Sequence, residues 1–137
     1  MLLYQLDSKD TVKTIYDGLK AKSLPLWMDT PDANGRFSNL KIRLRKVKNA
    51  AAVCCFLTPV YQQSRECVNE LVFAKEQGIC IIPCRMCRNW KPTDWSEYCV
   101  AGLKWIDFCG AETKIDLKIQ RLYDEILYHV GDVIEIG

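Results

Sequence analysis

The stretch NAAAVCCFLTPVYQQSRECVNELVFAKEQGICIIP, residues 49–83, holds two short apolar runs separated by a helical pattern. The runs at 51–58 and 79–84 are too short and too rich in strand-forming residues for helices, so each predicts a strand. Between them, Cys67 and Leu71 lie four residues apart and share one face of a predicted helix. A strand, a helix and a second strand in this order predict parallel pairing through a right-handed crossover.

The same alternation continues outward from this stretch. Apolar runs at 1–6, 24–29 and 103–108 predict three further strands, and the segment 85–102, which is polar and aromatic, is expected to be irregular. The remaining helical faces are marked by Val12, Ile15, Tyr16 and Leu19 after a cap at Ser8 or Asp10, by Leu40, Leu44, Val47 and Ala51, and by Ile115, Ile119, Leu122, Ile126 and Val130. The prediction is an α/β fold with a flavodoxin-like five-stranded parallel sheet, order 2-1-3-4-5, and helices on both faces.

Composition narrows the class of protein. The chain has 137 residues, 49% of them hydrophobic and 26% charged, which fits one globular domain with a real core. The net charge is only +2, and the basic residues are scattered except in KIRLRKVK at 41–48, so we expect no nucleic-acid partner. No apolar run is long enough to cross a membrane, and the first residues lack the features of a signal peptide. We therefore expect a cytoplasmic protein without membrane insertion.

The eight cysteines lie mostly inside apolar runs, where a free thiol behaves as a small hydrophobic group. Cys84 and Cys87 have the spacing of half a zinc site, with Cys80 and Cys99 as conceivable further ligands. No second pair with this spacing follows, and His129 is the only histidine. We expect reduced cysteines and no bound metal, with a zinc- or redox-responsive domain as the weaker alternative.

In sheets of this kind, ligands bind beyond the carboxyl ends of the strands, near the point where the strand order reverses. That edge would gather residues 4–7, 29–37 and 58–64 and the loop after Cys84. Neither a Walker loop nor a glycine-rich dinucleotide fingerprint is present, since the first turn reads LDSKDT. A two-component receiver would carry its acceptor aspartate where this chain has Thr58 and Pro59. The sequence thus excludes three common functions of the architecture.

Four segments together resemble a Toll/interleukin-1 receptor (TIR) domain: 2–29, the loop DTPDANGRF at 29–37, the stretch 49–83, and LKWIDF at 103–108. The resemblance covers nearly the whole chain and implies a single domain over 1–137, alone or within a longer protein. It also implies innate-immune or cell-death signalling in the cytoplasm. Some members of the family are assembly scaffolds, and others cleave NAD+ at the nicotinamide glycosidic bond.

The pattern S-x-x-C-x-x-E of NAD-cleaving members is intact as Ser64, Cys67 and Glu70. The resemblance therefore implies Glu70 as the catalytic residue, Ser64 and Cys67 as substrate-binding residues, and NAD+ as a substrate without a further cofactor. The products would be nicotinamide and ADP-ribose or a cyclic form of it. Departure of nicotinamide leaves an oxocarbenium-like ribosyl cation that one carboxylate can stabilise, and a leaving group that is already cationic needs no general acid.

Helical periodicity alone does not choose between two glutamates. Glu70 lies about 60° from Cys67 around the helix and about 100° from Leu71, whereas Glu66 lies about 100° from Cys67 on the other side. The family pattern favours Glu70, and Glu66 is then a solvated acid in the first turn. The alternative for Glu70 is a surface glutamate paired with a nearby lysine or arginine.

Aromatic residues supply further candidates for the site. Tyr4 matches an aromatic residue that lines the pocket of NAD-cleaving relatives, with ordinary strand packing as its alternative. Trp90 and Trp95 lie in a polar loop from which they could stack on adenine or nicotinamide, and we favour Trp90, although loop tryptophans as commonly cover a core edge. Trp27 and Trp105 fall in predicted strands and are expected in the core.

A non-enzymatic scaffold is the alternative function. Receptor members usually carry R-D-x-x-P-G in the loop after the second strand, whereas this chain keeps Asp29, Pro31 and Gly35 at other spacing. This exposed loop, with Arg36, is the expected site of self-association and of contact with other TIR domains. The basic helix at 41–48 would provide a second surface.

Overall fold

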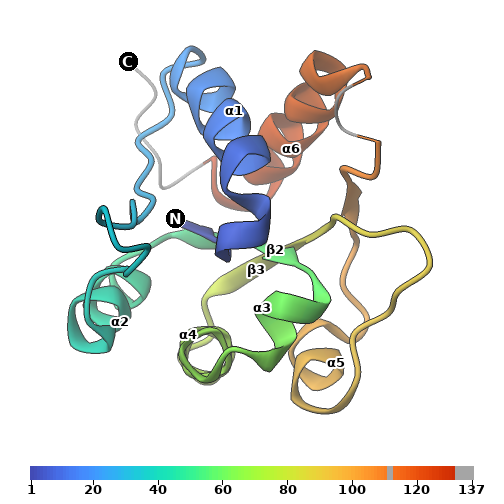
Figure 1. Ribbon diagram of the computed structural model, residues 1–137. Helices are drawn as coiled ribbons and strands as arrows, with labels where there is room; N and C mark the ends of the chain where they lie inside the picture. Colours follow the sequence, from blue (N-terminus) through green and yellow to red (C-terminus); the bar gives the residue numbers. More distant parts are fainter. Residues whose placement is uncertain (111–112, 132–137) are drawn as a thin grey trace.

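The computed structural model describes residues 1–110 and 113–131, and within them four parallel strands form a sheet in the order β1-β2-β3-β4 (Figure 1). The central strands pair along six residues, from Ala52 opposite Cys80 to Leu57 opposite Arg85, whereas each outer strand pairs through only two residues. The strands are β1 Leu2–Leu3, β2 Ala52–Leu57, β3 Cys80–Arg85 and β4 Ile106–Asp107.

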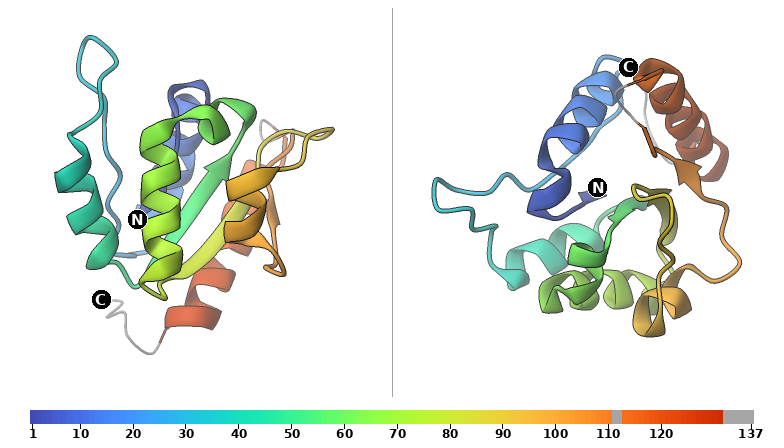
Figure 2. Two further views of the ribbon diagram at one scale, coloured as in Figure 1. Left: turned by 90° about the horizontal axis from the view of Figure 1, so that it is seen from below. Right: turned by 45° about the vertical axis from the view of Figure 1, so that its right-hand side comes forward.

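Helices cover both faces of this sheet, as the alternation of strand and helix patterns predicted. The helices α1 and α6 pack together on one face, and α2, α4 and α5 lie on the other (Figure 2). The bounds are η1 Leu6–Ser8, α1 Lys9–Lys20, α2 Leu40–Lys48, α3 Pro59–Gln63, α4 Arg65–Glu76, α5 Asp94–Val100 and α6 Ile115–Val130.

The predicted five-stranded sheet with order 2-1-3-4-5 is wrong in its count and therefore in the detail of its order. Segment 24–29 forms no strand and contributes a single parallel bridge between Met28 and Leu2, supported by a hydrogen bond from Leu2 N to Trp27 O of 3.0 Å. Two physical reasons account for this. Pro25 has no N–H to donate to a ladder, and β1 itself offers only two residues for pairing.

Two short helices replace segments that the sequence left without regular structure. Helix α5 lies within 85–102, which was expected to be irregular, and it turns Cys99 and Val100 into the core. Helix α3 begins directly after β2, because the Thr58 side chain accepts a hydrogen bond from Tyr61 N at 3.0 Å and Pro59 occupies the first turn.

The core consists of two layers, one on each side of β2, whose six residues are all buried. Side chains alternate along a strand, so Phe56 packs toward α1 and α6 while Leu57 packs toward α2, α4 and α5. Helices α1 and α6 approach closely at Gly18, where a Cβ atom would come within 2.8 Å of Ile119 Cδ1. The elements that carry candidate site residues are thus held by packing on both faces.

All eight cysteines are free, and six of them are buried. Burial raises the pKa of Cys54 to about 11 and also raises that of Cys67. Residues 1–110 and 113–131 contain no group of three or more histidine, cysteine, aspartate or glutamate side chains arranged to hold a metal ion.

None of the described helices combines the length and the apolar character needed to cross a membrane.

Candidate functional site

Helix α4 presents Glu70 toward β1 and toward Tyr4, the residue that follows this strand. Its start is fixed by Ser64, whose Oγ accepts a hydrogen bond from Cys67 N at 3.3 Å. Cys67, Glu70 and Leu71 are all buried on the side of the helix that faces the sheet. The structure therefore answers the question that periodicity left open, because Glu70 turns inward while Glu66 stays half-exposed to solvent, with 55% of its side chain accessible.

The Glu70 carboxylate is bonded through both of its oxygens to one arginine. Arg43 Nε donates to Glu70 Oε2 at 3.0 Å, and Arg43 Nη2 bonds Glu70 Oε1. Arg43 Nη1 bonds Glu66 Oε2, so a single guanidinium serves two carboxylates. Arg43 and Glu70 are only 3% and 1% exposed, which makes this a buried, bidentate ion pair.

Arg43 was not among the predicted site residues, because the basic run at 41–48 read as an exposed helix face. That expectation is wrong for Arg43. It lies four residues before Val47, so the two side chains share the core-facing side of α2, and both are buried. The spacing from Val47 was the signal that could have found it. The Phe37 ring centroid lies 5.4 Å from Arg43 Cζ and helps to cover the guanidinium.

The space next to Glu70 is small. Tyr4, Asp29, Phe37, Arg43 and Glu70 border a cavity of about 10 Å³, which is about the volume that one water molecule needs. Glu70 therefore does not lie at the rim of an open cleft. A dinucleotide could reach the carboxylate only after side chains on its border had moved.

The structure brings four of the predicted site residues close together: Tyr4, Ser64, Cys67 and Glu70. Gln5 Nε2 donates to Ser64 Oγ at 3.1 Å and to Cys67 Sγ at 3.3 Å, which ties the segment after β1 to the start of α4. Tyr4 borders the same cavity as Glu70. Gln5 was missed because no motif marked it, and its role follows only from this contact across 59 residues of sequence.

Burial dominates the titration of the site. It raises the pKa of Glu70 to about 7, although Arg43 acts in the opposite direction. It also raises the pKa of Tyr4 to about 12, with a smaller contribution from Asp29. The Tyr4 hydroxyl donates a hydrogen bond to the Asp29 carbonyl, so Tyr4 is a neutral, anchored side chain at neutral pH.

The loop at 29–37 is anchored at its first residue and exposed at its tip. Asp29 is buried, and its carboxylate accepts hydrogen bonds from Ser38 N at 2.6 Å and Ser38 Oγ at 2.7 Å. At the tip, Gly35 has a φ of 75°, which favours glycine, and Arg36 is exposed. Pro31 is half-buried. Between α1 and α2 this loop projects from the body of the domain (Figure 2).

Among the tryptophans, Trp27 borders the cavity beside Glu70, whereas neither candidate for substrate stacking, Trp90 or Trp95, does so. Trp90 is half-buried and packs against the core layer on the side of α4, and it does not border the cavity beside Glu70. Trp95 donates from its indole nitrogen to Gln62 O at 3.0 Å. Trp27 and Trp105, expected in the core, are each half-buried. Substrate stacking on Trp90 therefore receives no support from this arrangement.

Comparisons with known proteins agree with the architecture. The family model of the TIR domain matches residues 1–123. Among solved structures, the chain is similar to the TIR domain of the Toll-related receptor TRR-2 from Hydra magnipapillata, with a TM-score of 0.67 and 14% sequence identity over 91% of this chain and 94% of that one. At this identity the similarity concerns the fold alone. Among curated proteins, no significant match exists.

Proposed function

The chain belongs to the TIR domain family, a family of signalling domains, and from this premise we propose that it is an NAD+ glycohydrolase acting in cytoplasmic innate-immune or cell-death signalling. The observation that supports the proposal is the position of Glu70, which borders one cavity with Tyr4, the residue that follows the carboxyl end of β1. Ser64 and Cys67 complete the pattern within hydrogen-bonding reach of Gln5.

In this reaction the bond between the ribose carbon and the nicotinamide nitrogen breaks, and its electron pair leaves with nicotinamide as a neutral molecule. The ribosyl group that remains carries positive charge, which an ionised Glu70 beside it would stabilise. Water then attacks the ribosyl carbon and releases a proton to give ADP-ribose, or adenine attacks it within the same molecule to give a cyclic product. No metal or redox cofactor takes part.

Arg43 must leave Glu70 before substrate can approach, because it occupies both carboxylate oxygens in the closed arrangement. The half-exposed Glu66 already holds a third nitrogen of Arg43 and could retain the guanidinium when the arginine swings outward. The loop at 29–37 leads directly into α2, which carries Arg43. Self-association through this loop, with Asp29, Pro31, Gly35 and Arg36, is the proposed event that opens the site.

The test is nicotinamide release from NAD+ over a wide range of protein concentrations. Specific activity should rise with concentration if association opens the site. Glu70→Gln preserves the size of the side chain but removes its charge and one of the two acceptor oxygens that Arg43 uses, and it should reduce nicotinamide release by about 10²–10³. Glu76→Gln removes the same charge from an exposed position at the end of α4 and is the matched control, which should retain most activity. Equal rates for the parent and Glu70→Gln would disprove catalysis by Glu70.

A non-enzymatic scaffold is the second candidate, and one observation favours it. Glu70 already has a full set of hydrogen bonds from Arg43, which gives it a structural role independent of catalysis. TIR domains mediate TIR–TIR interactions, and the projecting loop at 29–37 offers a surface for them. A protein that self-associates but releases no nicotinamide at any concentration would identify the scaffold.

A further inference from the structure

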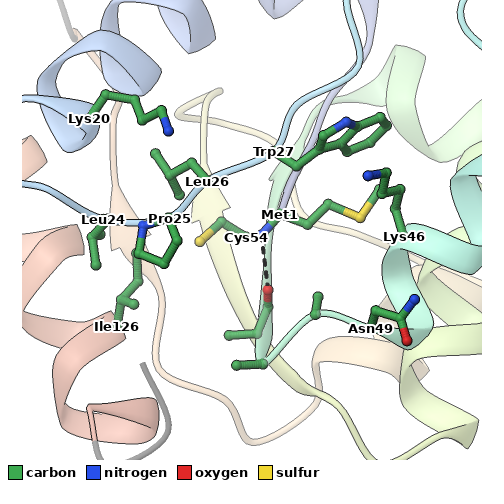
Figure 3. Close-up of a pocket in the computed structure, with 13 residues that line it drawn as sticks. Met1, Lys20, Leu24, Pro25, Leu26, Trp27, Lys46, Asn49, Cys54 and Ile126 are labelled. Atoms are coloured by element: carbon green, nitrogen blue, oxygen red, sulfur yellow. Dashed lines mark hydrogen bonds between the residues drawn. The ribbon is translucent and has the colours of Figure 1, made fainter. Parts of the chain in front are cut away.

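A much larger cavity lies at the opposite end of the sheet, where β2 begins (Figure 3). Its volume is about 770 Å³, which falls in the range of pockets that hold small organic molecules. The end of α1, the segment after it, the end of α2 and one turn of α6 surround it. No residue of the Glu70 cavity except Met1 and Trp27 takes part in its lining.

One side of this cavity is apolar. Leu24, Pro25, Leu26 and Ile126 lie together on the side of α1 and α6, as Figure 3 shows, and the indole of Trp27 lies across from them. Leu26 and Trp27 are half-buried and keep part of their surface open. Such a wall favours a ligand with an apolar body, because covering it removes apolar surface from water.

Among residues 1–110 and 113–131, the polar part of the lining is cationic or neutral. Lys20 and Lys46 contribute to it, Asn49 adds an amide, and this part of the lining contains no aspartate or glutamate. Neither lysine forms an ion pair with a carboxylate of residues 1–110 or 113–131, in contrast to Lys13, whose Nζ lies 2.7 Å from Asp17 Oδ1. Lys46 Nζ instead lies 5.5 Å from the Trp27 ring centroid. Charge complementarity therefore favours an anion.

We propose that this cavity binds a small anion carried on an apolar body, of the aryl or acyl phosphate or carboxylate class. The apolar body contacts Leu26 and Ile126, and the anionic group meets Lys20 and Lys46 with the Asn49 amide as a further donor. This site is separate from Glu70 and does not depend on NAD+ cleavage.

The probe is 1-naphthyl phosphate, titrated into the full chain by isothermal calorimetry at low ionic strength. Two partial probes separate the contributions: 1-naphthol has the same body without the charge, and inorganic phosphate has the charge without the body. The complete probe should bind at least ten times more tightly than either. Equal affinity for naphthol and naphthyl phosphate, or no saturable binding, would overturn the proposal.

Variants place the binding at the cavity. The double variant Lys20→Met/Lys46→Met keeps the aliphatic stems and should lose at least ten-fold in affinity. Lys41→Met/Lys48→Met removes the same number of charges from exposed positions of α2 outside the lining and should bind as the parent does. Equal losses in the two variants would show binding by net charge alone and contradict the site.

The segment 132–137, with its acidic Asp132 and Glu135, is the competing occupant, because it follows α6 in the sequence. Asp132→Asn/Glu135→Gln should leave the affinity for naphthyl phosphate nearly unchanged. If binding becomes detectable only in this variant, the cavity belongs to the chain's own tail and the proposal is wrong.

Discussion

The two ends of the sheet use charge in opposite ways. At the carboxyl end, Arg43 and Glu70 are buried and satisfy each other beside a cavity of about 10 Å³. At the amino end, Lys20 and Lys46 border a cavity of about 770 Å³, and none of the described residues in its lining is acidic. Helix α2 contributes a cation to each end, from positions three residues apart. The comparison shows that burial and pairing, and not the number of basic residues, decide whether a cationic side chain is available to bind a ligand.

The largest effect on stability should come from removing the buried carboxylate of Glu70. Glu70→Ala leaves Arg43 buried without its bidentate partner, which should lower the free energy of unfolding by about 3–5 kcal/mol. Urea denaturation measures the loss. Glu66→Ala removes a half-exposed partner of the same arginine and should cost no more than about 1 kcal/mol. A Glu70→Ala variant as stable as the parent would mean that Arg43 reaches water freely.

Replacing both charges should restore much of that loss. Arg43→Met and Glu70→Leu are each expected to destabilise, since each leaves one buried charged or polar group unpaired. The double variant carries two apolar side chains in a closed interior and should unfold within about 1–2 kcal/mol of the parent. The double-mutant cycle then reports the coupling energy. Strict additivity of the two single variants would contradict a direct, buried pair.

Freeing the Glu70 carboxylate from Arg43 should raise nicotinamide release if Glu70 is catalytic. Arg43→Met removes the group that occupies the carboxylate, so it should raise nicotinamide release about ten-fold at dilutions where the parent protein is nearly inactive, a gain of about 1.4 kcal/mol. Lys41→Met lies on the exposed side of the same helix and serves as the control. A fall in activity for Arg43→Met alone would show that Arg43 assists the substrate and does not block it.

A further prediction concerns pH. Burial raises the pKa of Glu70 in the folded protein to about 7, above its ordinary value of 4.5. Between these values the folded state binds more protons than the unfolded state, so the stability due to this group declines as the pH rises from 4.5 to about 7. Glu70→Gln should lack this slope in chemical denaturation. The opposite slope would mean that Arg43 outweighs burial.

Much of the fold was predictable because its signals are local. The apolar runs of β2 and β3 and the periodic faces of α1, α4 and α6 each follow from neighbouring residues. The second strand was wrong because its pairing depends on a partner, β1, that has only two residues. Helix α3 was missed because five residues are too few for a periodic pattern.

The candidate site was predictable only in part. The S-x-x-C-x-x-E pattern identified Glu70, and the structure places Ser64 and Cys67 near it, yet the burial of Glu70 depends on a side chain 27 residues away in sequence. No pattern among neighbouring residues predicts a contact between Arg43 and Glu70. Arg43 was interpreted as one of several exposed charges in a basic helix, because arginine side chains are rarely buried.

The buried cysteines can report how often the structure around each of them opens. Cys67 lies on α4 beside Glu70, whereas Cys55 lies in the middle of β2, and burial raises the pKa of both. An alkylating reagent attacks the thiolate, so each of these sulfurs is modified at a rate set by how often its surroundings open. Cys55 would report global unfolding and Cys67 would report local breathing at the end of the sheet where Glu70 lies. The ratio of the two rates measures how far the free energy of opening this site lies below the free energy of global unfolding.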